Sequence, residues 1–167
     1  MIYVMAIYGH KNYGNAMGVA REAMKVLGID PGENTGFASY EDGKLVDLWT
    51  LNPLDAIGYL SRTREEKQEN ILFIMEDSRL QTVNYHGIKE NKSVIFTIGR
   101  RVGTVDGLCA LYEAAIGKNK LIKLSPLQKG SKLGADYFKS MTGWDGKTNQ
   151  HCRDAATVSW QFRNYKP

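Results

Sequence analysis

The sequence predicts an α/β fold with a five-stranded mixed sheet, three antiparallel strands and then two parallel ones, flanked by helices. Two unbroken apolar runs predict buried strands: residues 26–29 stop at Asp30, and residues 71–75 stop at Glu76. Apolar residues recur at helical spacing between residues 95 and 116. Because a carboxylate is costly to bury at the end of such a strand, both acids are candidates for function.

The first half of the chain is expected to form a meander followed by a helix. Asp42-Gly43 is a strong signal for a two-residue hairpin turn. Asn52 followed by Pro53 is a typical helix start, and this helix leads to a strand at residues 71–76. The strands of the meander are expected at residues 25–30, 36–40 and 45–51.

The second half is expected to alternate helices with one more strand. A polar stretch at residues 77–93 precedes the long helix at 95–116. A short strand follows at residues 121–124, and Ser125-Pro126 marks another helical start. The final helix is expected to begin near His151 and to run toward residue 162.

The composition is that of a globular protein with a single domain. The 167 residues suffice for one domain with a substantial core, and 43% hydrophobic with 24% charged residues is ordinary for a globular chain. The net charge of +4 is compatible with a polyanionic partner. Cys109 and Cys152 have neither metal-site nor disulfide spacing, so we expect a reduced, cytoplasmic setting. No run approaches the roughly 20 apolar residues of a membrane span.

The first 23 residues fit the rest of the chain poorly. Gly9, Gly14 and Gly18 interrupt them, and Met24 stands directly before the first expected strand. Two interpretations remain open: translation starts naturally at Met24, or residues 1–23 form an extra strand or arm. The apolar start of this segment lacks a basic leader, so we expect no signal peptide. We therefore treat residues 1–23 as an N-terminal extension and residues 24–167 as one domain.

A candidate catalytic site follows from the strand order. If the first and fourth strands pair in parallel through a right-handed crossover, Asp30 and Glu76 lie side by side at one sheet edge. The last helix can bring His151 and Asp154 to the same edge, because residues three apart share a helix face. Oxygen ligands that converge in this way suit Mg²⁺ or Mn²⁺, which indicates metal-assisted phosphodiester chemistry.

These residues resemble the RNase H-like superfamily and, within it, the RuvC-type Holliday-junction resolvases. The likeness lies in the Gly-Ile-Asp-Pro-Gly segment at residues 28–32, the strand ending at Glu76, and the closing His151-x-x-Asp154-Ala155. It covers about residues 24–162. The sequence around Arg153 is similar to bacteriophage members of the group. The resemblance implies that residues 24–167 are an RNase H-like nuclease domain.

The resemblance also implies an activity: hydrolysis of DNA phosphodiester bonds at four-way or other branched junctions. Asp30, Glu76, His151 and Asp154 would be catalytic and would bind two Mg²⁺ or Mn²⁺ ions. Many members carry aspartate where His151 stands; histidine is a softer ligand and favours Mn²⁺. A homodimer would nick two strands symmetrically.

The helix at residues 95–116 corresponds to the dimer contact in the resemblance. Gly99, Gly103 and Gly107 recur every fourth position and would allow close helix approach. Core packing against the sheet is an equally open explanation of these glycines and of the apolar stripe.

DNA contacts are expected from basic and aromatic side chains. Related resolvases place lysines between the last strand and last helices, use an aromatic wedge in the loop after the glutamate, and hold phosphates with basic groups. For any single basic residue, a solvated charged face explains it equally well. The candidates are Lys129, Lys132, Arg79, Tyr85, Arg100 and Arg101, with Trp144 a weaker second aromatic.

Three other functions are alternatives for this sequence. The first is a nuclease of the same fold that acts on RNA-containing or branched DNA in general, or one that takes part in RNA processing. Another is a junction-binding protein without catalysis, against which the four filled ligand positions argue. An ATPase of the actin or sugar-kinase type also begins with an aspartate before a glycine turn, but it needs two such domains, and 167 residues are too few.

Overall fold

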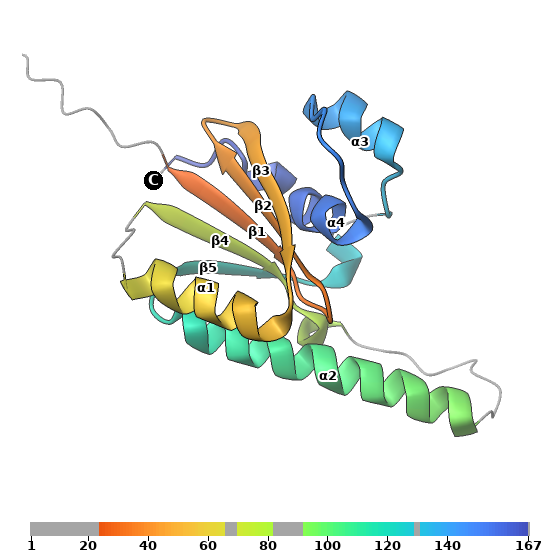
Figure 1. Ribbon diagram of the computed structural model, residues 1–167. Helices are drawn as coiled ribbons and strands as arrows, with labels where there is room; N and C mark the ends of the chain where they lie inside the picture. The colour runs from red at the N-terminus through yellow and green to blue at the C-terminus, as the bar shows by residue number, and fades with distance from the viewer. Residues whose placement is uncertain (1–23, 66–69, 82–91, 129–130, 167) are drawn as a thin grey trace, which may run out of the picture.

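A computed structural model describes residues 24–65, 70–81, 92–128 and 131–166. The sheet has five strands in the order β3-β2-β1-β4-β5 (Figure 1). Strand β1 pairs antiparallel with β2, which pairs antiparallel with β3; β4 is parallel to β1 and β5 is parallel to β4. The α/β class and the mixed sheet of three antiparallel and two parallel strands are confirmed. The strands are β1 Lys25–Asp30, β2 Thr35–Glu41, β3 Lys44–Leu51, β4 Ile71–Glu76 and β5 Lys120–Leu124.

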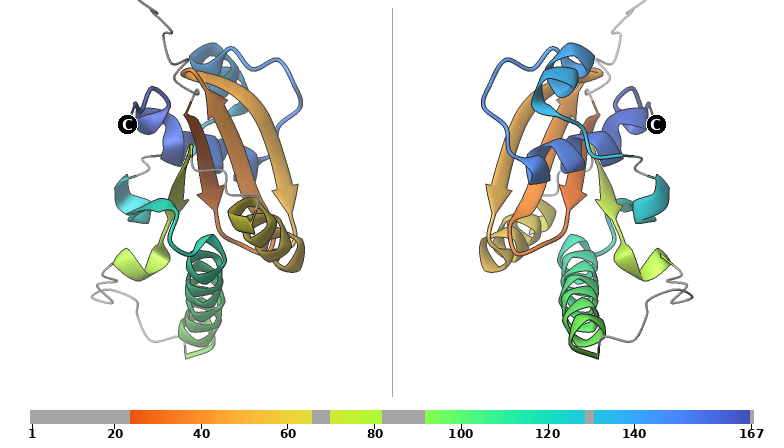
Figure 2. Two further views of the ribbon diagram at one scale, coloured as in Figure 1. Left: turned by 90° about the vertical axis from the view of Figure 1, so that its left-hand side faces the viewer. Right: turned by 90° about the vertical axis from the view of Figure 1, so that its right-hand side faces the viewer.

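Helices cover both faces of the sheet. Helices α1 and α2 lie on one face, and α4 lies on the other with α3 beside it (Figures 1 and 2). Three short 3₁₀ helices, η1 to η3, follow β4, β5 and α4. Among the described helices, none has the length and apolar character needed to cross a membrane. The bounds are α1 Pro53–Glu65, α2 Lys92–Ile116, α3 Ala135–Thr142, α4 Gln150–Ser159, η1 Ser78–Leu80, η2 Pro126–Gln128 and η3 Trp160–Phe162.

The hairpin between β2 and β3 turns where the sequence predicts it. Asp42 and Gly43 both have positive φ, 49° and 79°. Two consecutive positive φ values are typical of the type I′ turn, whose twist matches that of paired strands. The conformation of this two-residue turn therefore determines how β2 pairs with β3.

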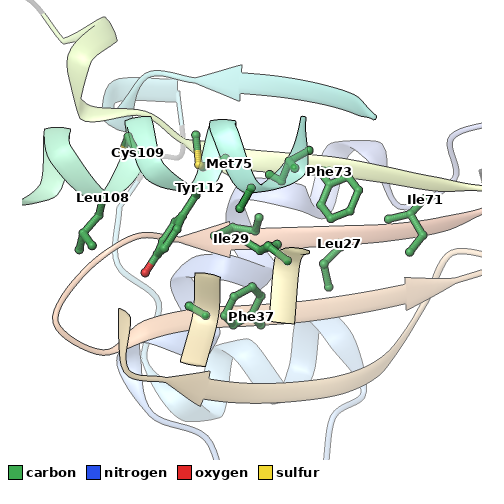
Figure 3. Close-up of a cluster of buried hydrophobic side chains, with 13 residues drawn as sticks. Leu27, Ile29, Phe37, Ile71, Phe73, Met75, Leu108, Cys109 and Tyr112 are labelled. Carbon is green, nitrogen blue, oxygen red and sulfur yellow. The ribbon is translucent and has the colours of Figure 1, made fainter. Parts of the chain in front are cut away.

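Strand β1 divides the core into two clusters by the alternation of its side chains. Leu27 and Ile29 pack with α1 and α2, whereas Val26 packs with α4. Figure 3 shows the first cluster, in which Tyr112 of α2 reaches toward the sheet and its hydroxyl lies 2.5 Å from Thr35 Oγ1. Both faces of β1 are buried, as its unbroken apolar run predicts.

Helix α4 lies close against the sheet because two glycines leave room for its backbone. A Cβ at Gly28 would collide with the carbonyl oxygen of Ala155, and a Cβ at Gly36 would collide with the carbonyl oxygen of His151. Ala155 and Ala156, which are buried on the helix, are also small side chains. This close approach determines how near the α4 side chains lie to the end of β1.

Helix boundaries after β5 differ from the expectation. Ser125-Pro126 begins only the single 3₁₀ turn η2, and the final helix ends at Ser159 before η3. Helix α3 was not expected as a separate helix. Its N-cap, Gly134, makes no side-chain hydrogen bond, so the usual start signal is missing from the sequence.

The glycine stripe of α2 faces away from the sheet. A Cβ added at Gly99, Gly103 or Gly107 meets no atom of the described residues within 4 Å. Core packing therefore does not explain these glycines, and that interpretation is wrong for them. The use of this face in a homodimer stays a prediction.

We expect Gly103→Ala to stabilise the protein against unfolding by roughly 0.5–1 kcal/mol, because alanine costs less backbone entropy than glycine inside an exposed helix. Urea denaturation at low protein concentration measures this. Gly58→Ala in α1, whose added Cβ makes only an ordinary contact with Arg62 at 3.5 Å, is the matched control. A loss of stability at position 103 alone would show that the stripe packs against another chain.

Candidate active site at the ends of strands β1 and β4

Asp30 and Glu76 end two adjacent parallel strands at the same level. The register pairs Ile29 with Met75, and the two acids are the next residue on each strand. Because Ile29 and Met75 face the core formed with α1 and α2, alternation turns both carboxylates toward the opposite face, which α4 covers. The expected juxtaposition of these two acids at one sheet edge is confirmed.

The start of α4 places His151 beside Asp30. Asn149 caps the helix by accepting a hydrogen bond from the Cys152 backbone N–H at 2.9 Å. His151 Nδ1 lies 3.4 Å from Asp30 Oδ2. The His151 side chain is 43% exposed and that of Asp30 only 11%. The imidazole therefore lies between solvent and the largely buried carboxylate.

Asp154 is held on the same helix by a relay of polar side chains. Its Oδ1 accepts a hydrogen bond from Gln150 Nε2 at 2.6 Å, and Gln150 Oε1 accepts one from the Arg153 guanidinium at 2.9 Å. The guanidinium also donates to the Leu133 carbonyl at 3.0 Å and to Thr148 Oγ1 at 2.9 Å. Gln150 and Arg153 thus orient a carboxylate that is 5% exposed.

The sequence contained a signal for part of this relay. Gln150 lies four residues before Asp154, a spacing at which helical side chains meet. Arg153 belongs to the closing pattern that resembles the bacteriophage proteins. Neither was predicted as a site residue. The Leu133 carbonyl that anchors the Arg153 side chain lies 20 positions away in the sequence, so this contact has no local signal.

The donor set is suited to a divalent cation, but its side chains do not converge. Asp30, Glu76 and Asp154 offer hard oxygen ligands and His151 a nitrogen, as Mg²⁺ or Mn²⁺ sites require. Within the described residues, no three His, Cys, Asp or Glu side chains form a group that could hold a metal ion. The structure brings Asp30 into contact with His151 and leaves Asp154 bonded to Gln150. Metal binding by the four residues stays a prediction.

An ion-pair network fixes the chain directly after Glu76. Asp77, 1% exposed, accepts two hydrogen bonds from the Arg79 guanidinium, at 2.7 and 2.6 Å. Arg79 also donates to Glu113 Oε2 at 2.7 Å, and Lys123 Nζ to Glu113 Oε1 at 2.8 Å. The hydrogen bonds from Arg79 lower the pKa of Asp77, and those from Lys123 and Arg79 lower the pKa of Glu113. The network ties η1 to α2 and β5, so the Arg79 side chain has a structural role here.

We expect Arg79→Ala to destabilise the protein by about 2–3 kcal/mol at neutral pH, because the buried Asp77 loses its counter-charge. The wild-type contribution is present above the unfolded pKa of Asp77, near 3.9, and is lost as the pH falls through the lowered folded pKa. In the variant, burial favours the neutral acid. The stability difference between the two proteins should therefore shrink between about pH 5 and pH 2 in denaturant titrations.

A difference that stays constant over this pH range would contradict the structural role of the ion pair. Arg62→Ala, an exposed arginine near the end of α1, is the control and should change stability by no more than about 0.5 kcal/mol. The part of Arg79 in DNA binding stays a prediction.

The other predicted DNA contacts lie in different places. Arg100 and Arg101, both exposed, line a cleft that also includes His151. Lys132 is exposed in the segment before α3 and is not among the described residues that line this cleft. Lys129 and Tyr85 lie outside the described residues. Trp144 is partly buried and packs against the cluster between α4 and the sheet.

Comparison with known proteins adds little. No family model and no curated protein matches the sequence. Among solved structures, the chain is similar to one described as the Aquifex aeolicus PPX-GPPA enzyme, with 14% identity and a TM-score of 0.35. The likeness covers 75% of this chain and 43% of that chain, so this chain matches less than half of that protein. A TM-score of this size identifies neither a shared fold family nor a function.

Proposed function

We propose that this protein is a divalent-metal-dependent endonuclease with an RNase H-like domain, which cuts DNA at four-way or other branched junctions. The observation that carries the proposal is the meeting of three elements. Asp30 and Glu76 end adjacent parallel strands, and His151, which is 121 positions from Asp30, lies 3.4 Å from it. Acids that end neighbouring strands, with an imidazole from a helix beside one of them, are typical of a catalytic site.

The arrangement of the sheet supports the same proposal. The order of the elements is the one that the resemblance to RNase H-like nucleases implies: three antiparallel strands, a crossover helix, and then a parallel strand on the other side of β1. Helix α4 crosses β1 and β2 on the face toward which both acids turn (Figure 1). The four proposed catalytic residues therefore come from three elements that pack directly on one another.

In this proposal, Asp30, Glu76, His151 and Asp154 hold the ions. Divalent ions held there would activate a water molecule as the nucleophile and would stabilise the charge on the leaving oxygen. The protein's own part is positional: Gln150 and Arg153 orient Asp154, and the Asp77–Arg79 pair fixes the backbone next to Glu76. A homodimer would present two such sites to the two strands of one junction.

The test uses a synthetic four-way junction labelled on each strand in turn, with Mg²⁺, Mn²⁺ or EDTA. We expect paired nicks at symmetric positions with either metal, faster with Mn²⁺, and none in EDTA. Flaps, plain duplex and RNA–DNA hybrids are the comparison substrates. Equal cutting of hybrids or flaps would show that the protein is a nuclease of broader specificity and is not specific for junctions. Tight junction binding without nicking in either metal would identify a non-catalytic binding protein.

A further inference from the structure

A cleft of about 480 Å³ lies between α2, the turn from β1 to β2, and the start of α4. Figures 1 and 2 show that the N-terminal half of α2 projects past the edge of the sheet where β1 and β4 end. His151 is in the lining, so the cleft adjoins the His151–Asp30 pair. Any molecule in the cleft would reach the candidate catalytic residues.

Helix α2 contributes one continuous face to this cleft. Its lining residues are spaced three or four positions apart over about two helical turns, or about 12 Å. Such a length can follow two or more successive phosphates of one nucleic-acid strand. The residues on this face are Thr97, Arg100, Arg101, Thr104 and Val105.

The chemistry of the lining suits phosphate groups. Arg100 and Arg101 are both exposed, and a guanidinium fork matches the oxygens of a phosphate. Asn34, on the opposite wall, adds an amide donor, while Glu33 is the acidic side chain of the lining. Phe, Tyr and Trp side chains are absent from the described residues that line the cleft.

We propose that this cleft binds the sugar–phosphate backbone of one DNA strand, with Arg100 and Arg101 contacting phosphates next to the bond that is cut. This inference rests on the proposed function and specifies how the substrate is held. Backbone contacts carry no sequence information. Binding through the cleft is therefore independent of base sequence.

The test measures binding of a labelled four-way junction in EDTA, where no cutting occurs, over a series of salt concentrations. Arg100→Ala and Arg101→Ala should each weaken binding about tenfold and lower the slope of log K against log salt by about one, because each removes one phosphate contact. Two junctions of unrelated sequence should show the same loss. Arg101→Lys should restore much of the affinity, since the charge is kept.

Arg62→Ala is the matched control: an exposed arginine on α1, outside the cleft, whose loss should leave affinity and slope unchanged. Each variant is first checked by thermal unfolding, and an exposed substitution of this kind should leave the melting temperature close to that of the wild type. Inorganic phosphate and a mononucleotide are tested as competitors. They should displace the junction only weakly, since each occupies one contact.

The outcomes separate the two proposals. If the wild-type protein nicks junctions but Arg100→Ala and Arg101→Ala bind them as tightly as wild type, the cleft proposal is overturned and the nuclease stands. A loss that depends on base sequence also overturns it. Tight binding of phosphate or mononucleotide alone would make the cleft a small-molecule site. If the wild-type protein neither binds nor nicks DNA, the proposed function falls as well.

Discussion

Asp30→Asn is expected to abolish metal-dependent nicking of a four-way junction while junction binding stays within about threefold of wild type. Asparagine has almost the same shape as aspartate but no charge, and charge is what a metal ligand at this position supplies. Even residues that only support metal ligands cost about 10- to 100-fold when replaced, so a ligand itself should cost more than about 100-fold in single-turnover rate. Binding depends on phosphate contacts elsewhere and should be retained.

The measurement pairs single-turnover cleavage in Mg²⁺ or Mn²⁺ with gel-shift binding in EDTA. Glu76→Gln should behave in the same way, because Glu76 ends the neighbouring strand at the same level. Asp47→Asn on β3, an exposed aspartate remote from the site, is the control and should cut at the wild-type rate. Wild-type turnover by Asp30→Asn or Glu76→Gln would refute the catalytic assignment.

Gly36→Ala is expected to destabilise the protein by about 2–3 kcal/mol and to remove most of its nicking activity. The new Cβ would collide with the carbonyl oxygen and carbon of His151, so α4 must move away from the sheet. Overpacking of a close contact typically costs about 1–3 kcal/mol, and backbone atoms on the helix side cannot rotate aside. Because His151 itself is at the point of collision, its distance from Asp30 must also change.

Gly32→Ala is the control that shows whether any alanine substitution in or near this turn destabilises the protein. It lies four residues earlier, and its added Cβ makes only an ordinary contact with the Asn34 carbonyl at 3.7 Å. Denaturant unfolding and junction cleavage, measured for both variants, should show a loss for Gly36→Ala alone. Equal stability of the two would mean that α4 does not lie as close to β2 as the structure shows.

Local patterns predicted most of the elements because their causes are local. The apolar runs that end at Asp30 and Glu76 form β1 and β4, and Asp42-Gly43 forms the turn between β2 and β3. Asn149 caps α4 with a bond to a residue three positions away. Where the local signal was absent, as at Gly134 before α3, the element was missed.

The candidate site was predictable only in outline. Strand pairing and helix periodicity sufficed to place Asp30, Glu76 and the start of α4 at one edge. Which carboxylate contacts which partner depends on competition between hydrogen-bond donors from different elements. The spacing of four positions allows Gln150 to engage Asp154, but the contact of Arg79 with Glu113, 34 positions away, does not follow from any local spacing.

The sequence by itself determined the order of the strands, the residues that end them and the turn that pairs β2 with β3, because backbone conformation and burial pattern are encoded over a few neighbouring positions. Only the tertiary structure decided that Gly36 makes room for His151, that the glycines of α2 face outward, and that Arg100 and Arg101 share a cleft with His151. These outcomes depend on distances between residues far apart in the chain, which packing of both sheet faces sets.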